Sequence, residues 1–260
     1  MGQVLIVSLA KNIEEYKTLA SEYQVGFEVN DFYNPDVLEN PDEMNRLIAF
    51  YQEQGLPDNS TMHGAFFDMV VFSYDSRIRE ISELRMEQSM KVAVRLGVKG
   101  VVFHTNYSPM LSGTEYDRRA VEMTAQYMEC LLKRYPDTEI YLENMFDSDP
   151  AIMIEISQRL WSYGNYGVCF DYAHASISST PMERWVTGLA PYIKHVHVND
   201  NDFVHDLHLA IGDGKIDWKQ FMRYRKQYFP DCSVLIETTS PENQRRSLEY
   251  LQDNFKDFLL

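Results

Sequence analysis

Eight short runs rich in β-branched and aromatic residues alternate along the chain with longer stretches of helical periodicity. The runs, and therefore the expected strands, lie at 3–8, 24–29, 60–64, 100–105, 139–144, 167–172, 193–199 and 233–238. The connections between them are too long for hairpins and are typical of parallel strands joined by helical crossovers. The economical closure for eight such units is an α/β fold of the (β/α)8 type, which we expect to form one domain over 1–260.

An open, doubly wound sheet is the alternative arrangement for the same alternation. Such a sheet normally carries a glycine-rich phosphate loop after its first strand. The residues that follow the first expected strand are Leu9, Ala10 and Lys11, with no glycine among them. The closed barrel is therefore favoured.

Two helices can be placed from local signals. The spacing of Ile78, Ile81, Leu84, Val92 and Leu96 predicts a helix over 78–96 that buries these side chains as one stripe and ends before a glycine at position 97. A polar entry that finishes in a proline at position 150 predicts a second helix over 151–161.

Charge and composition limit the partners. The formal net charge of -15 argues against nucleic acid, because phosphate binding depends on clustered Lys and Arg. Three widely spaced cysteines, Cys130, Cys169 and Cys232, indicate reduced thiols. No apolar run is long enough to span a bilayer and no leader peptide is expected, so we expect a cytoplasmic protein that binds no membrane; a homo-oligomer stays open.

Polar side chains stand near the end of six consecutive expected strands. These are His63, His104, Glu143, Asp171, His197 and Glu237. In barrels of this kind the carboxyl ends of the strands carry the chemistry, so the six should converge at one rim. Taken singly, each has an ordinary explanation as a hydrogen-bonding or solvated group, but together they predict a metal site.

Further ligands are expected from the most histidine-rich stretch of the chain, 195–217, and from the segment that follows the sixth expected strand. His174, Asp206 and His208 can join the site from loops, whereas His195 should lie deeper as an orienting group and His205 should be a loop residue. Mixed imidazole and carboxylate ligands suit transition metals better than calcium. Zinc or manganese is the first expectation, followed by magnesium, cobalt or iron.

Several motifs together resemble the xylose-isomerase-like TIM-barrel superfamily, which includes sugar isomerases, ketose epimerases and endonuclease IV. They are L-E-N at 142–144, F-D-Y-A-H at 170–174, H-V-H-V-N-D at 195–200, D-L-H at 206–208, G-D-G-K-I-D-W at 212–218 and I-E-T at 236–238. The resemblance covers nearly the whole chain. It is specific for the superfamily and less so for the reaction.

For the isomerases and epimerases, the resemblance implies one divalent ion held by Glu143, Asp171, His197 and Glu237. Such an ion would polarise the carbonyl of an open-chain sugar or sugar phosphate and stabilise an enediolate, while Glu143 and Glu237 act as the catalytic proton-transfer pair. Aromatic residues are expected to wall a compact pocket for this carbohydrate. They are Phe27, Phe32, Tyr33, Phe66, Phe67, Tyr107 and Trp218, with Phe27, Tyr107, His174 and Trp218 as the substrate-binding residues.

For endonuclease IV, the resemblance implies a zinc cluster that cleaves abasic DNA. All nine ligand types find a match, in His63, His104, Glu143, Asp171, His174, His197, Asp206, His208 and Glu237. The ketose epimerases place an arginine in the loop after the seventh strand, where this chain has Asp206 and His208, which leaves room for two or three ions. The acidic charge favours the sugar enzyme, and a barrel that binds metal or sugar without catalysis is the third alternative.

Overall fold

The computed structural model describes residues 2–66, 68–238, 240–256 and 258, and its eight strands close into a barrel in sequence order. Each strand pairs in parallel with its neighbours, and β1 pairs with β8 to complete the ring. The strands are β1 (Val4–Ser8), β2 (Gly26–Val29), β3 (Thr61–His63), β4 (Gly100–His104), β5 (Glu139–Glu143), β6 (Tyr166–Asp171), β7 (Ile193–Val198) and β8 (Ser233–Ile236). The predicted (β/α)8 fold is confirmed.

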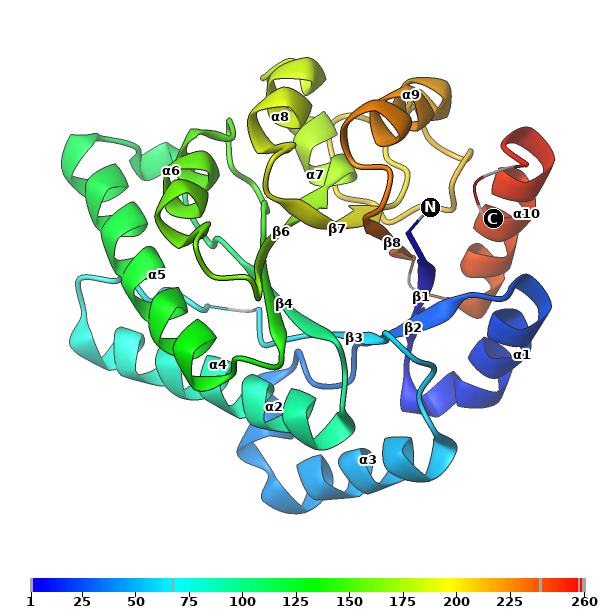
Figure 1. Cartoon of the computed structure of the whole chain (residues 1–260), viewed down its shortest axis with the longest axis horizontal. Helices are drawn as coiled ribbons and strands as arrows, with labels where there is room; N and C mark the ends of the chain where they lie inside the picture. The colour runs from blue at the N-terminus through cyan, green and yellow to red at the C-terminus, as the bar shows by residue number, and fades with distance from the viewer. Residues whose placement is uncertain (1, 67, 239, 257, 259–260) are drawn as a thin grey trace.

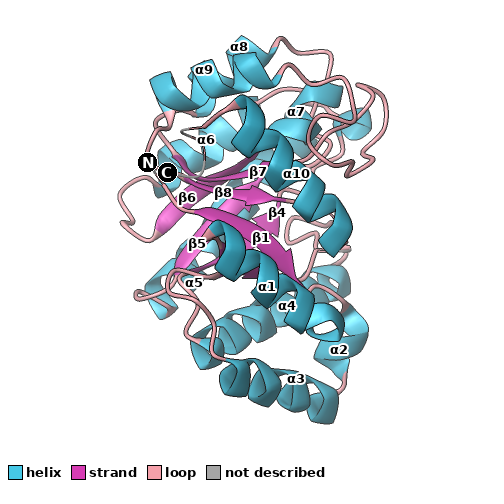
Figure 2. Ribbon diagram, turned by 90° about the vertical axis from the view of Figure 1, so that its right-hand side faces the viewer, coloured by secondary structure: helices cyan, strands magenta, loops and turns pink. Residues whose placement is uncertain are grey.

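Helices surround this ring on the outside, as Figures 1 and 2 show from two directions. They are α1 (Ile13–Tyr23), α2 (Pro35–Glu39), α3 (Pro41–Gln54), α4 (Ser76–Leu96), α5 (Thr114–Arg134), α6 (Ala151–Leu160), α7 (Tyr172–Ile177), α8 (Met182–Leu189), α9 (Trp218–Tyr228) and α10 (Pro241–Asn254), with short 3-10 turns η1 (Ala10–Asn12) and η2 (Pro109–Leu111). None of the helices in the described part of the chain combines the length and apolar character needed to cross a bilayer.

The two faces of the barrel wall differ in chemistry. Side chains such as Phe27 and Val29 belong to the large apolar core cluster that the strands share with the helices. Among the described residues, the interior holds small apolar clusters, one of them built on Leu5 and Leu235 and another on Tyr141. Because strand side chains alternate between faces, the residues between the outward-facing ones point into the barrel, and many of these are polar.

Helix α4 begins at Ser76 and ends at Leu96 before a left-handed glycine, close to the predicted bounds. The predicted stripe is only partly buried: Val92 is buried and Leu96 packs against the core, whereas Ile78, Ile81 and Leu84 are 40–47% exposed. In the N-terminal half the buried face includes polar residues that make specific bonds, and Ser82 Oγ accepts the backbone N–H of Val70. Hydrophobic spacing alone therefore predicted the buried face at the end of the helix and not at its beginning.

The long connection between β7 and α9 is held in place by one buried carboxylate. Asp200 pairs its backbone with Leu209 in an isolated antiparallel bridge. Its side chain accepts hydrogen bonds from the backbone N–H of Gly212 at 2.9 Å and of Ile216 at 3.1 Å, and from Trp218 Nε1 at 2.9 Å. The segment between Asp200 and Leu209 is thereby held in place at the end of β7.

Glycine 214 lies so close to Asp200 that a side chain would not fit. A Cβ at this position would lie 2.2 Å from Asp200 Oδ1 and 2.4 Å from the carbonyl oxygen of Asn201. Backbone atoms would have to move to accept it. The second glycine of the G-D-G motif is thus required by close packing.

We expect Gly214→Ala to lower the free energy of unfolding by about 1–3 kcal/mol, the usual cost of forcing extra atoms into a packed site. Equilibrium urea unfolding measures the change. Gly164→Ala is the matched control, because nothing lies within 4 Å of the added Cβ. Equal stability of the two variants would contradict the role given to Gly214.

Candidate metal centre

Glu143, the last residue of β5, lies at the centre of the polar cluster inside the barrel mouth. Its Oε2 lies 3.3 Å from His104 Nε2 and 3.5 Å from His63 Nε2. Its Oε1 lies 3.3 Å from His197 Nδ1 and 3.7 Å from His174 Nδ1. The carboxylate therefore faces imidazoles from four different parts of the chain.

A second group forms where α7, which follows β6 directly, meets the loop after β7. Asp171 caps α7 by accepting the backbone N–H of His174 at 2.6 Å, and this cap turns the histidine toward the mouth. His174 Nε2 lies 3.3 Å from Asp206 Oδ2, and His208 Nε2 lies 3.0 Å from the same oxygen. His174, expected in a loop, lies in α7 instead, where it meets Asp206 and His208 of the loop after β7.

The donor atoms fall into three groups at this mouth, each with its members' ligand atoms within 4.8 Å of one another. The groups are His63, His104 and Glu143; His174, Asp206 and His208; and Glu143, Asp171, His197 and Glu237. Glu143 belongs to two of them. All nine residues predicted as metal ligands are therefore gathered at one end of the barrel.

Several of these buried polar atoms have no hydrogen-bond partner in the described part of the chain. They include both carboxylate oxygens of Glu143, Asp171 Oδ2, His197 Nδ1 and Glu237 Oε2. A buried carboxylate oxygen without a donor is costly, and such groups are normally paired or bound to a metal. The donor set fits a divalent cation on these grounds.

Burial and charge act in opposite directions on the carboxylates. Burial alone would raise the pKa of Glu143, but facing His197 and His104 outweigh it and hold the pKa well below 4.5. For Asp171, burial, reinforced by the charges of Glu237 and Glu143, raises the pKa from 3.8 to about 7 despite the opposing effect of His174. The raised pKa of Asp171 indicates that the neighbouring imidazoles do not fully compensate the negative charge of the carboxylates in this cluster.

A cavity of about 740 Å³ opens above this centre. Glu143, Asp171 and His197 are fully buried beneath it, whereas the Glu237 side chain keeps 12% exposure and lines the cavity. The cavity is lined by Val7, Leu9, Lys11, Asn30, Asp31, Tyr33, Asn34, Val37, His63, Phe66, His104, Met145, Phe146, His174, Asp206, His208, Glu237 and Thr238. Glu237 is thus the one member of the four-ligand group that faces this space.

Three of the residues predicted to bind substrate lie elsewhere, which corrects that expectation. Phe27 is on the outer face of β2 and packs in the core shared with the helices. Tyr107 donates its hydroxyl to Asp117 Oδ1 at 2.6 Å, and Trp218 donates Nε1 to Asp200. Each is nearly buried and absent from the lining of the cavity.

Some of the other residues predicted to wall the pocket line the cavity and others do not. Tyr33 and Phe66 do line the cavity, with their rings stacked at 4.8 Å between centroids. Phe32 is fully buried against Tyr51 instead. Phe67 lies outside the described residues.

Glu28, a fully buried carboxylate in β2, was not among the predicted site residues. Its Oε2 lies 3.1 Å from Nε2 of His195, which is deep in the barrel as expected. The signal was present, because Glu28 is a lone charge between the apolar Phe27 and Val29. His205 is exposed and pairs only with Asp202 of its own loop among the described residues.

Comparison with known proteins places the chain in a family. The family model described as "Xylose isomerase-like TIM barrel" matches residues 19–254, which is most of the chain. The chain belongs to this family. Its fold and its mouth-facing cluster are accordingly those of a xylose isomerase-like TIM barrel with buried His and Glu groups suited to a metal.

Individual relatives are distant in sequence, and the solved structures among the matches share the fold. The uncharacterized protein MJ1311 of Methanocaldococcus jannaschii is 26% identical over 202 residues, which are 74% of this chain and 68% of that protein. The structure of the TTHB071 protein from Thermus thermophilus, soaked with ZnCl2, superposes with a TM-score of 0.79 at 23% identity over 98% of both chains. A D-tagatose 3-epimerase-like protein has a TM-score of 0.77 at 21% identity over 98% of this chain and 97% of its own.

Asp147, in the loop after β5, is buried beside the metal centre. Its Oδ2 accepts hydrogen bonds from Thr105 Oγ1 at 2.6 Å and from the backbone N–H of Met145 at 3.0 Å. Burial raises the pKa of this carboxyl from 3.8 to about 6, although both hydrogen bonds oppose the change. The folded protein therefore holds this proton more tightly than the unfolded chain.

We expect Asp147→Asn to become progressively more stable than the wild type as the pH rises from about 4 to about 6. Between these pH values the free energy of unfolding of the wild type falls, because the Asp147 carboxyl ionises less readily in the folded state than in the unfolded state. Each unit of pKa difference between the two states lowers the free energy of unfolding by about 1.4 kcal/mol. Urea unfolding at pH 4, 5, 6 and 7 measures the difference, with the exposed Asp253→Asn as control. Parallel curves for wild type and Asp147→Asn would contradict the assignment.

Proposed function

We propose that the chain is a divalent-metal-dependent isomerase or epimerase acting on a sugar or sugar phosphate. The observation that carries the proposal is the group formed by Glu143, Asp171, His197 and Glu237, with one carboxylate facing a polar and aromatic cavity. These four residues would hold the ion. When bound there, a divalent ion would supply Lewis-acid polarisation of a substrate carbonyl.

Glu237 is the residue that we assign to proton transfer. It lines the cavity, whereas Glu143 is fully buried and is shared by two donor groups. A carboxylate within reach of the carbon beside a polarised carbonyl can remove its proton and return it to the former carbonyl carbon, while the proton of the neighbouring hydroxyl passes to the former carbonyl oxygen; the net result is an isomerisation. Inversion at one carbon needs a second proton-transfer group on the opposite face, and Glu143, the other carboxylate of the predicted catalytic pair, is the proposed group for that step.

The cavity itself suits a small polar ligand. Its volume of about 740 Å³ lies in the range of small-molecule sites. Asn30, Asp31 and Asn34 add hydrogen-bonding groups to the lining, and Tyr33 and Phe66 add an aromatic wall. Hydroxyl groups and C–H faces of a carbohydrate match this mixture.

Hydrolysis of a phosphodiester by two or three zinc ions is the second candidate. The observation in its favour is that Glu143 belongs to two groups and that His174, Asp206 and His208 form a third. Against a DNA substrate, Lys11 is the one lysine or arginine among the described residues that line the cavity. A nucleic acid would need more cationic contacts.

Metal content and substrate panels separate the two candidates. We expect purified protein to contain a divalent ion by elemental analysis and to exchange a substrate C–H proton with deuterated solvent when aldoses, ketoses and their phosphates are screened by NMR. Treatment with a chelator should abolish this exchange, and zinc or manganese should restore it. Three zinc ions per chain with cleavage of abasic DNA, and no exchange on sugars, would overturn the proposal.

Replacing Glu237 by Gln tests the assigned base. The amide keeps the shape but cannot accept the proton, so we expect kcat for exchange to fall by about 10²–10⁴-fold, the usual contribution of a general base. Glu242→Gln, an exposed change in the first turn of α10, is the matched control and should keep wild-type kcat. Unchanged turnover by Glu237→Gln would remove Glu237 from the mechanism.

A further inference from the structure

We propose that Glu28 is a positioning residue for the metal centre, which holds the His197 ring from below so that Nδ1 is the atom offered to the cation. The inference rests on the proposed function, because it assigns an auxiliary residue to that same site. Glu28 comes from β2, whereas the proposed ligands come from β3 to β8 and the loops that follow them. Nothing in the chemistry proposed above uses it.

The two nitrogens of His197 face different partners. Nδ1 points to the upper cluster, at 3.3 Å from Glu143 Oε1 and 3.5 Å from Glu237 Oε2. Nε2 points down and lies 3.3 Å from Glu28 Oε1. Both atoms are buried and neither makes an aligned hydrogen bond among the described residues, so their 3.3 Å contact is an ion-pair distance between two otherwise unpartnered polar atoms.

Glu28 is itself fixed in place. Its Oε2 accepts the hydroxyl of Thr61 at 2.7 Å and lies 3.1 Å from His195 Nε2. His195 Nδ1 in turn lies 2.7 Å from Ser233 Oγ, and the His195 ring stacks on Tyr141. A chain of polar contacts therefore leads from the lower interior of the barrel up to His197, and every side chain in it has its place set by a neighbour.

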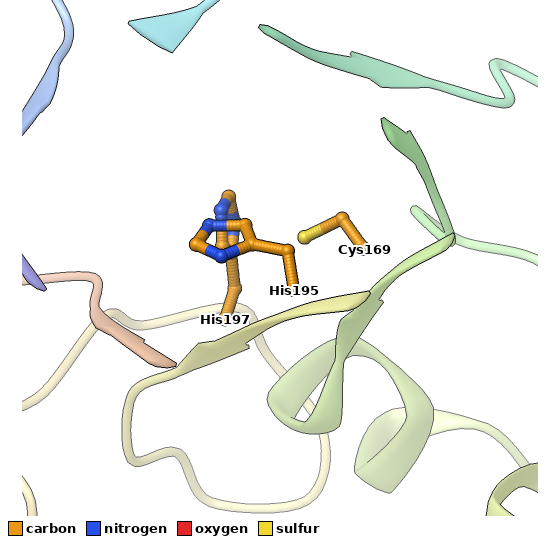
Figure 3. Close-up of side chains that lie close together, drawn as sticks. All are labelled: Cys169, His195 and His197. Atoms are coloured by element: carbon orange, nitrogen blue, oxygen red, sulfur yellow. The ribbon is translucent and has the colours of Figure 1, made fainter. Parts of the chain in front are cut away.

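Cys169 completes the surroundings of the two rings. Figure 3 shows its sulfur directed toward His195 and His197 inside the barrel. These three residues also fall within mutual ligand distance of a metal. Both nitrogens of His195 already lie against Ser233 and Glu28, however, so the arrangement is better explained as packing beneath the upper centre than as a separate site.

A carboxylate that accepts the distal N–H of a ligating histidine fixes the tautomer and the orientation of the ring. Loss of such a partner typically weakens metal binding by about 10–100-fold. Here the protonated nitrogen would be Nε2, because that is the nitrogen next to Glu28. The coordinating nitrogen is then Nδ1, which already faces the carboxylates of Glu143 and Glu237.

The test compares Glu28→Leu and Glu28→Gln with the wild type. Leucine removes both acceptor oxygens, whereas glutamine leaves one oxygen to serve two imidazoles. We expect zinc affinity, measured by competition with a chromophoric chelator, to fall by about 10–100-fold in Glu28→Leu and by less in Glu28→Gln. Ser233→Ala is the matched control, because it loosens His195 and leaves the contact of Glu28 with His197 intact, and it should bind zinc within about twofold of wild type.

A spectroscopic measurement tests the same inference without a variant. Long-range ¹⁵N–¹H spectra of the zinc-loaded wild type should show His197 protonated at Nε2 and metal-bound at Nδ1. Coordination through Nε2 would overturn the inference, and this result does not depend on the variant. Circular dichroism and thermal unfolding of the metal-free Glu28→Leu variant show whether that variant folds.

The outcomes also separate the inference from the proposed function. A folded Glu28→Leu variant with wild-type zinc affinity overturns the role of Glu28 and does not contradict the proposed metal-dependent function. A wild-type chain that binds no divalent ion overturns both.

Discussion

Two fully buried carboxylates, Glu28 and Glu143, face one imidazole from opposite sides, and the mouth of the barrel is built around this contact. A carboxylate deep in a protein is costly unless an opposite charge or a donor faces it. Burial would raise the pKa of both groups, yet the histidines outweigh it and lower both pKa values. The charge balance of the interior therefore depends on His197.

The alternation of side chains along each strand makes this contact available. The interior of many barrels of this type is filled by branched apolar residues. Here the inward positions carry Glu28, Thr61, Glu143, His195 and His197, while the apolar residues between them pack against the helices. A slip of one residue in β2 would place Phe27 inside and Glu28 among the helices, so the register of this short strand decides the chemistry of the mouth.

A small register shift between β6 and β7 has a similar effect. Val168 pairs with Ile193 and Cys169 with His195, so one residue of β7 is passed over. As a result Asp171 pairs with His197, and the two proposed ligands stand side by side at the rim. Asp200 then anchors the loop that brings Asp206 and His208 over the same rim, which extends the donor set beyond the strand ends.

The sequence alone determined the fold and the members of the polar cluster. Eight alternating units leave few closures, and strands that end in His, Glu or Asp must meet at one rim because parallel strands in a barrel end together. Local sequence patterns could not decide which face of a helix such as α4 is buried. Thus Ile78 and Ile81 are exposed while Ser82 is buried, because Ser82 bonds the backbone of the preceding loop. The tertiary structure also decided that Trp218 donates a hydrogen bond to Asp200 and that Glu28 lies under His197. Both contacts join segments that are brought together only when the barrel closes.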